Sequence, residues 1–238
     1  MAADPRLLHT ITVELCTAAA LFAAISVVIK LASDGYLKYF EGKWETGDKA
    51  ARVLSVYTEP TAYLMAIGGV SFTFVSMYSG LSTWPLEALI GNEAAHNKML
   101  LTSVSQTMLV VFIAIRFSFG EKLWKNKILV AIYAALAIMA AIFVVLQNSV
   151  AGHLAGKGSL LDPFLQFVNV DLTKEIIFPP LMSIALIAGS TGALAITIFY
   201  SRRAKRRRLE EERLERLEEE SETEIAVSET ETHVAENE

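Results

Sequence analysis

Residues 7–31 read LLHTITVELCTAAALFAAISVVIKL, a run of 25 residues dominated by apolar side chains. About 20 such residues in a helix cross a hydrocarbon layer about 30 Å thick, and in lipid a helix pairs every backbone amide within its own segment. The run exceeds the roughly 7–15 residues of a signal-peptide core, and it lacks a basic n-region and a clear small-x-small cleavage site. We therefore expect it to be retained as a first transmembrane helix.

Four further runs share this length and composition. They are Tyr57 to Leu81, Asn97 to Phe117, Ile128 to Ser149 and Ile176 to Tyr200. The whole chain is 53% hydrophobic with a mean hydropathy of +0.41, which is more apolar than an ordinary soluble domain. No alternating period favours a barrel. The sequence therefore predicts an all-α fold, an integral membrane bundle of five transmembrane helices.

The basic residues predict the orientation of this bundle. They gather between the first and second runs, between the third and fourth runs, and directly after the fifth: Lys38, Lys43, Lys49, Arg52; Lys122, Lys125, Lys127; Arg202, Arg203, Lys205, Arg206, Arg207, Arg208. Segments rich in Lys and Arg stay on the cytoplasmic side. We expect a multi-pass protein of the cell membrane with its N-terminus outside and its C-terminus in the cytoplasm. The outer link Val150 to Lys174 is too apolar for a solvated loop and predicts an amphipathic segment lying in the interface.

The composition changes after Tyr200. Residues 1–200 carry 13 basic and 13 acidic residues, whereas residues 201–238 carry 8 basic and 13 acidic residues, so the net charge of −5 lies in the tail. Strong helix formers at 209–220 favour a helix, and the polar composition beyond Ser221 predicts disorder. We expect a five-helix membrane domain at 1–200 and a basic-then-acidic cytoplasmic tail at 201–238.

Several classes of function lack their motifs in this chain. The sequence has no nucleotide-binding loop, zinc-hydrolase motif, serine-nucleophile motif or regular basic face for nucleic acid. No paired repeats with interrupted helices indicate a secondary transporter. The single cysteine, Cys16, lies inside an apolar run, where we interpret it as a small packing residue. Soluble enzymes and nucleic-acid binders are therefore disfavoured.

Three histidines mark the predicted outer surface. His9 lies in the first turn of the first helix, His96 opens the third helix, and His153 follows the fourth. A neutral imidazole ligates haem iron, copper or zinc, so two of them on facing helices could clamp a haem and three could form an open metal site. Spacing along the sequence does not choose between these, and each histidine could instead be an amphipathic residue at the rim.

Two further polar residues lie within the predicted spans. Glu14 falls about 7 Å deeper than His9 along the first helix, and an ionisable group in a membrane segment is a candidate functional residue. We expect Glu14 to be paired or protonated. In the third helix Gln106 shares one broad face with His96, Ser103 and Thr107, a polar stripe that should face protein or water.

Four short motifs carry a resemblance to a known family. They are Leu7-Leu8-His9-Thr10-Ile11, the end of a glycine-containing second helix at Ser79-Gly80-Leu81, Ala94-Ala95-His96-Asn97 with Ile113-Ala114-Ile115-Arg116 closing the third helix, and the glycine-rich exit Ala151-Gly152-His153-Leu154-Ala155-Gly156-Lys157-Gly158. Over residues 7–158 the layout resembles a poorly characterised family of four-helix predicted membrane proteins, similar in layout to b-type cytochromes. The resemblance implies haem ligation by His9 and His96. The fifth helix, the charged tail and His153 depart from the pattern.

Our leading hypothesis is a membrane subunit that holds a b-type haem, or alternatively copper or zinc, near its outer face. It would serve in electron transfer or as an accessory subunit beside other membrane subunits, with His9 and His96 as ligands and His153 as a third ligand or neighbour. The alternative is a cofactor-free structural or assembly subunit that recruits partners through its helices and its cytoplasmic tail. A third possibility is an enzyme with an outer-face metal.

Overall fold

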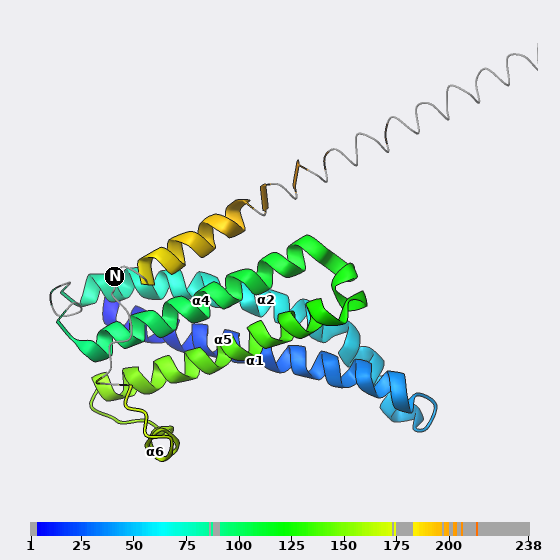
Figure 1. Ribbon diagram of the computed structural model, residues 1–238, viewed down its shortest axis with the longest axis horizontal. Helices are drawn as coiled ribbons and strands as arrows, with labels where there is room; N and C mark the ends of the chain where they lie inside the picture. The colour runs from blue at the N-terminus through cyan, green and yellow to red at the C-terminus, as the bar shows by residue number, and fades with distance from the viewer. Residues whose placement is uncertain are drawn as a thin grey trace, which may run out of the picture. The chain divides into compact units, whose positions relative to one another are not determined.

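The computed structural model describes residues 4–85, 87, 91–172, 174, 183–196, 198–199, 202–203, 206 and 213 (Figure 1). Within these residues every regular element is a helix and no strand occurs, which confirms the all-α prediction. The elements are α1 Pro5–Phe40, α2 Glu45–Thr83, α4 Glu93–Phe119, the 3-10 helix η1 Gly120–Lys125, α5 Lys127–Leu154, α6 Asp162–Phe167 and an apolar helix at Ser183–Ile196.

In the described part of the chain, four helical segments are long and apolar enough to cross a membrane. They are Pro5–Phe40, Glu45–Thr83, Glu93–Lys125 and Lys127–Leu154. The fifth predicted run is helical at Ser183–Ile196, which is shorter than these four; its residues 176–182, 197 and 200 lie outside the described residues.

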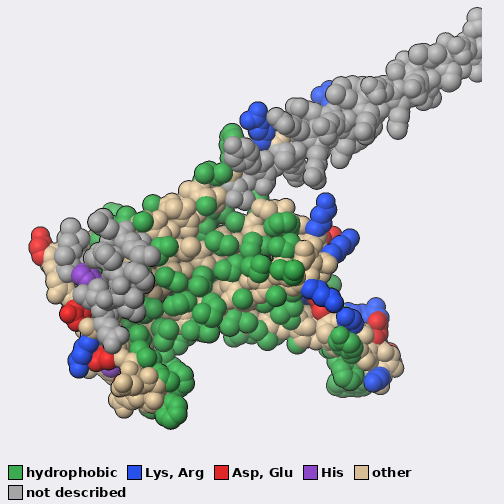
Figure 2. Space-filling view, in the orientation of Figure 1, with side chains coloured by type: hydrophobic (Ala, Val, Ile, Leu, Met, Phe, Trp, Pro, Cys, Tyr) green, Lys and Arg blue, Asp and Glu red, His purple; other side chains and the backbone are tan. Residues whose placement is uncertain are grey.

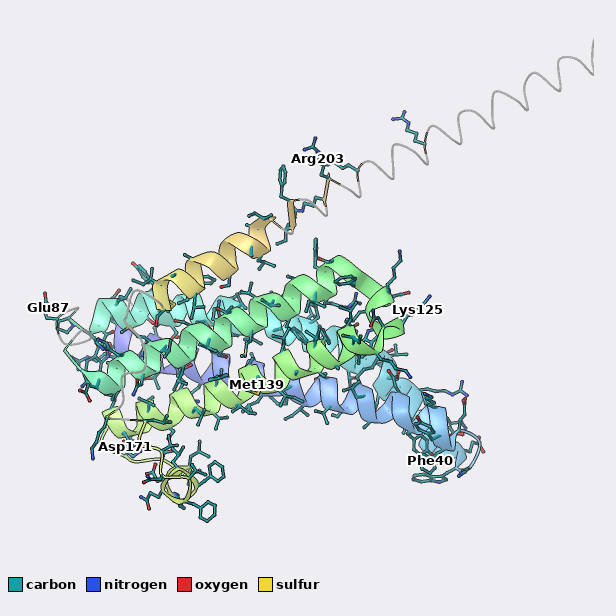
Figure 3. All side chains as sticks on the ribbon, viewed as in Figure 1. Phe40, Glu87, Lys125, Met139, Asp171 and Arg203 are labelled. Carbon is teal, nitrogen blue, oxygen red and sulfur yellow. The ribbon has the colours of Figure 1, made fainter. Side chains whose placement is uncertain are left out.

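The first two helices are longer than their apolar runs predicted. α1 and α2 have 36 and 39 residues, or roughly 54 and 58 Å at about 1.5 Å per residue. The expected link between them is mostly helix, because polar residues such as Lys49 and Glu45 support it through an i,i+4 pair at 2.7 Å. The turn closes at Gly42, whose φ of 85° suits glycine and whose N–H donates to Asp48 Oδ2 at 2.8 Å. The result is a helical hairpin with Phe40 near its tip (Figure 3).

The four long helices form a closed ring. α1 packs against α2, α2 against α4, α4 against α5, and α5 against α1, so that α1 and α4 are diagonally opposite. Successive helices are antiparallel, which places the start of α1, the start of α4 and the end of α5 at one end (Figure 1). We call this the histidine end.

Small side chains fill much of the interior of this ring. The fully buried alanines are Ala20, Ala23, Ala62, Ala66, Ala137 and Ala140. Gly69 of α2 lies so close to α1 and α4 that an added Cβ would meet Leu109 at 3.3 Å and Ala19 at 3.6 Å. Small residues at helix contacts let backbones approach closely, which favours association in lipid.

Two further segments follow the four long helices along the chain. The link after α5 contains α6, where Phe164 and Phe167 are largely exposed, as an interfacial amphipathic segment would be. Contacts divide the chain into Met1–Leu194 and Ala195–Glu238. Of the predicted tail only Arg202, Arg203, Arg206 and Arg213 are described, so the predicted tail helix and disorder lie outside the described residues.

Candidate functional site at the histidine end

His9 points from α1 toward the last turns of α2. Its Nδ1 lies 2.9 Å from the backbone oxygen of Ser76, with the Oγ atoms of Ser76 and Ser79 at 3.3 and 3.5 Å. Since a carbonyl oxygen only accepts, Nδ1 carries the proton in this contact, and in a neutral ring Nε2 then keeps its lone pair. Histidines that ligate metals are commonly fixed in this way by a backbone carbonyl.

Gly80 makes room for this imidazole. A Cβ built on Gly80 would lie 3.0 Å from His9 Cε1 and 3.2 Å from Nδ1. Such contacts are tighter than nearly all those that real Cβ atoms make. Gly80, which belongs to the motif Ser79-Gly80-Leu81 at the end of the second run, therefore leaves the space that the ring of His9 occupies.

His96 lies in the first turn of α4. Asn92 caps that helix, its Oδ1 accepting from the N–H of Ala95 at 3.1 Å. Both ring nitrogens of His96 are buried, and neither has a hydrogen-bond partner among the residues that the structure describes. A buried polar atom without a partner is unfavourable by roughly 1–3 kcal/mol, so this ring requires a partner beyond those side chains.

Lys98 of α4 lies near His9 of α1. Lys98 lies two residues after His96 on α4, yet it is near enough to His9 on the diagonal helix to act electrostatically on that ring. The beginning of α4 therefore lies near the beginning of α1 at the histidine end.

His153 is engaged elsewhere. Its Nε2 lies 2.8 Å from Asp162 Oδ1, and Asp162 Oδ2 accepts from the N–H of Ser159 at 2.9 Å. These bonds hold the pKa of Asp162 below its ordinary value, the Ser159 amide contributing most and His153 less, against some desolvation. The exit from α5 is tightly packed, because a Cβ on Gly152 would meet the carbonyl oxygen of Gly158 at 2.2 Å. Within the described ranges no group of three or more His, Cys, Asp or Glu side chains could hold a metal ion.

The polar stripe of the third run faces protein. Ser103 and Thr107 hydroxyls donate to carbonyls one turn back at 2.7 and 2.8 Å, and Thr107 Oγ1 also lies 3.4 Å from Leu186 O. Gln106 is 1% exposed, with Nε2 3.5 Å from the carbonyl of Val70. Its Oε1 has no hydrogen-bond partner in the described part of the chain. Gln106 is thus a second buried group on α4 with unmet hydrogen-bonding capacity.

Glu14 does not enter this site. It is exposed on α1, and no described residue forms an ion pair with it. Pairing within this part of the chain, one of the two states expected from the sequence, is therefore not observed.

The opposite end of the ring contains a cluster that the sequence analysis missed. Glu59 of α2, only 8% exposed, forms a two-point ion pair with Arg116 of α4. Tyr133 is fully buried and stacks on Phe112 with ring centroids 3.9 Å apart, and its hydroxyl lacks a hydrogen-bond partner among the described residues. An acidic residue within the second run and an arginine closing the third, both on the predicted cytoplasmic side, were the available signal.

Comparisons with known proteins found no relative of this chain. No protein-family model matches the chain, and neither a curated protein nor a solved structure does. The resemblance to the four-helix membrane family stays a prediction.

Proposed function

We propose that this chain is a multi-pass membrane protein that binds a b-type haem between His9 and His96 and serves in electron transfer within a larger membrane complex. In this proposal the histidine end lies outside and the opposite end faces the cytoplasm. Three observations support it: the placement of charged side chains, the hydrogen bonds of the two imidazoles, and the residues that contact His9.

The surface of the helices supports insertion in a bilayer. Figure 2 shows a broad band of hydrophobic side chains over the middle of the long helices, with Lys and Arg side chains gathered toward one end. Lys125 lies at that end and Glu87 at the other (Figure 3). A hydrophobic band bounded by a basic end is typical of a membrane protein whose basic end is cytoplasmic.

The three histidines differ in the hydrogen bonds of their ring nitrogens, and this difference is the observation that carries the haem proposal. His9 has one nitrogen fixed by the Ser76 carbonyl and the other available, and His96 has two buried nitrogens without a described partner. His153 has Nε2 occupied by Asp162. Two available imidazoles at one end of diagonal helices are the donor set of a haem with two axial histidines.

Residues beside His9 would support such a group. Gly80 leaves the clearance that the His9 ring needs, and Ser76 fixes its tautomer. Lys98 lies near His9 and would offer a basic side chain to a bound haem, whose propionates are anionic. When bound, haem supplies one-electron oxidation and reduction. The chain's own residues hold the ring orientation, retain the Nδ1 proton of His9 and keep the His96 ring away from bulk water.

The assembly-subunit alternative also has an observation in its favour. α1 exposes large apolar side chains along one face, with Glu14 among them, and this face needs lipid or another helix to cover it. A subunit that only recruits partners would show such a face and would bind no cofactor.

The test is a reduced-minus-oxidised optical spectrum of the detergent-purified full-length protein, with elemental analysis for iron, copper and zinc. We expect a b-type haem band in the wild type that is lost in His9→Ala and His96→Ala. His153→Ala is the matched control, because it removes an imidazole at the same end that is already bonded to Asp162. Size-exclusion profiles and helix content by circular dichroism establish that each variant is folded.

The other outcomes separate the alternatives. Stoichiometric copper or zinc without a haem band would show that the protein binds a metal ion instead of haem. Neither signal, in protein expressed with haem and metals supplied, would overturn the cofactor proposal and favour the assembly subunit. A haem band that is unchanged in His9→Ala and His96→Ala would show that other residues ligate the haem.

A further inference from the structure

One face of α1 points away from the ring of helices. The buried face of this helix, which includes Cys16, Ala20, Ala23 and Val27, packs toward its neighbours α2 and α5. The opposite face has its own pattern, at alternating spacings of four and three residues: Leu7, Ile11, Glu14, Ala18, Leu21, Ile25 and Val28. We call these seven residues the α1 outer seam.

Five residues of the outer seam are exposed, whereas Ala18 and Leu21 are half-buried and Leu21 also packs against the core. At about 100° per residue, Leu7 and Ile25 fall at the same angle around the helix and Glu14 falls within about 20° of both. Leu7, Ile11, Ile25 and Val28 are 58%, 44%, 51% and 49% exposed. Alternating spacings of four and three residues give the 3.5-residue period by which two helices pack along a common seam. The outer seam thus matches the pattern of a helix contact that this part of the chain does not supply.

Glu14 distinguishes this seam from an ordinary lipid-facing surface. Its carboxyl group lies seven residues, or about 10 Å, inside the apolar run that begins at Leu7. An isolated carboxylate facing lipid is costly, and such groups usually pair with another polar group. Glu14 is exposed, and the described residues offer it no ion-pair partner. A polar partner for Glu14 would therefore come from outside this part of the chain.

We propose that the α1 outer seam docks the same seam of a second copy of this chain, with Glu14 paired to Glu14 of the partner subunit. Two copies inserted with the same topology run parallel, so a two-fold interface sets each residue opposite its equivalent. One proton held between the two carboxyl groups then gives each of them a hydrogen-bond partner. Ala18, one turn deeper, leaves space for close helix approach.

A second copy fits this seam better than an unrelated helix does. A foreign helix would need both a matching apolar period and a polar group at the depth of Glu14. A second copy provides both automatically, because a seam with one central polar residue is self-complementary about a two-fold axis. This dimer does not depend on haem binding, since the outer seam points away from His9's partners on α2.

The experiment is disulfide cross-linking of the full chain in native membranes. Cys16→Ser removes the native thiol and keeps a hydroxyl for its contact with Thr73 at 2.9 Å. In that background Ile11→Cys, Ala18→Cys and Ile25→Cys place thiols on the seam. Leu15→Cys is the matched control, because Leu15 is also exposed, at 42%, but lies about 100° around α1 from Glu14.

We expect oxidation to give covalent dimers at the three seam positions and few at Leu15→Cys. Adding Glu14→Leu should weaken self-association about tenfold, the effect of losing a membrane hydrogen bond of roughly 1–2 kcal/mol. Glu14→Gln, which retains donor and acceptor atoms, should weaken it less. Equal yields at seam and control positions, unchanged dimer yield in Glu14→Leu, or seam cross-links to a different protein would each overturn the proposal.

Discussion

Glu59 of α2 and Arg116 of α4 are joined by two contacts at the end of the ring opposite the histidines. Arg116 Nη2 donates to Glu59 Oε2 at 3.1 Å, and Arg116 Nε donates to the other carboxylate oxygen. The two residues are 57 positions apart in the sequence. This fork-to-fork geometry fixes the spacing of α2 and α4 where Lys and Arg side chains are most concentrated.

Breaking this ion pair should destabilise the fold. Removing one partner of a buried pair costs roughly 3–5 kcal/mol because a charge is left uncompensated. The Arg116 side chain is 24% exposed, so we expect Glu59→Leu to fall at or below the lower end of that range. The measurement is the free energy of unfolding in mixed micelles titrated with a denaturing detergent.

Two further variants make that result specific. Glu59→Leu combined with Arg116→Leu should recover part of the loss, because neither charge is then left alone. Lys49→Ala breaks the exposed pair with Glu45 and should change stability by less than about 0.5 kcal/mol. A loss in Lys49→Ala as large as that in Glu59→Leu would show that burial of the pair is not the cause.

Gly80→Ala should displace the His9 ring. The added Cβ would meet Cε1 at 3.0 Å, and the imidazole could move only by weakening its bond to the Ser76 carbonyl. Overpacking of this kind costs roughly 1–3 kcal/mol. Gly68→Ala is the matched control on the same helix, since its Cβ would meet only Phe72 at 3.7 Å.

Gly68→Ala should change the free energy of unfolding in the opposite direction from Gly80→Ala. Alanine within a helix is favoured over glycine by roughly 0.5–1 kcal/mol, so Gly68→Ala should be neutral or stabilising. Unfolding free energies of the two variants in the same micelles decide the comparison. Equal changes would contradict a special role for Gly80 beside His9.

The loop that holds His153 should be sensitive to acid. Because the folded pKa of Asp162 is below its ordinary value of 3.8, the folded state binds fewer protons than the unfolded state as pH falls. The carboxylate therefore contributes stability above its ordinary pKa, and this contribution is lost as the pH falls through the folded pKa. Hydrogen exchange of the Ser159 amide, corrected for the intrinsic rate, should show protection at about pH 5 that declines toward about pH 2.

Asp162→Asn tests the cause of that change. An amide cannot titrate in this range, so protection of the Ser159 amide should be weaker and independent of pH. The same acid-dependent loss in Asp162→Asn would assign the effect to another group.

The helical content of the long segments could be predicted because it depends on local composition. The run beginning at Leu7 is long and apolar enough to form a membrane-length helix whatever it packs against. The helix ends were less predictable: α1 continues to Phe40 and α2 begins at Glu45, because polar helix formers extend both elements beyond the apolar runs. Glu59 is the third residue of the apolar run that begins at Tyr57, yet it lies well inside α2, which begins at Glu45.

The candidate site was predictable in its placement and not in its contacts. Antiparallel order alone puts His9, His96 and His153 at one end. The bond from His9 to Ser76 spans 67 residues, and no local pattern marks Ser76 as the acceptor. The hydrogen bond between His153 and Asp162, which leaves His9 and His96 as the available pair, likewise depends on the tertiary structure.

The sequence by itself determined which segments are helical, which of them are apolar enough for a membrane and which helix ends carry histidine, because these properties depend on chain order and on residues close together in the sequence. Only the tertiary structure decided how each helix is rotated about its axis. That rotation turns His9 toward α2, leaves Glu14 exposed and brings Glu59 onto Arg116. It results from the simultaneous packing of small side chains between neighbouring helices, to which residues many turns apart in the chain contribute together.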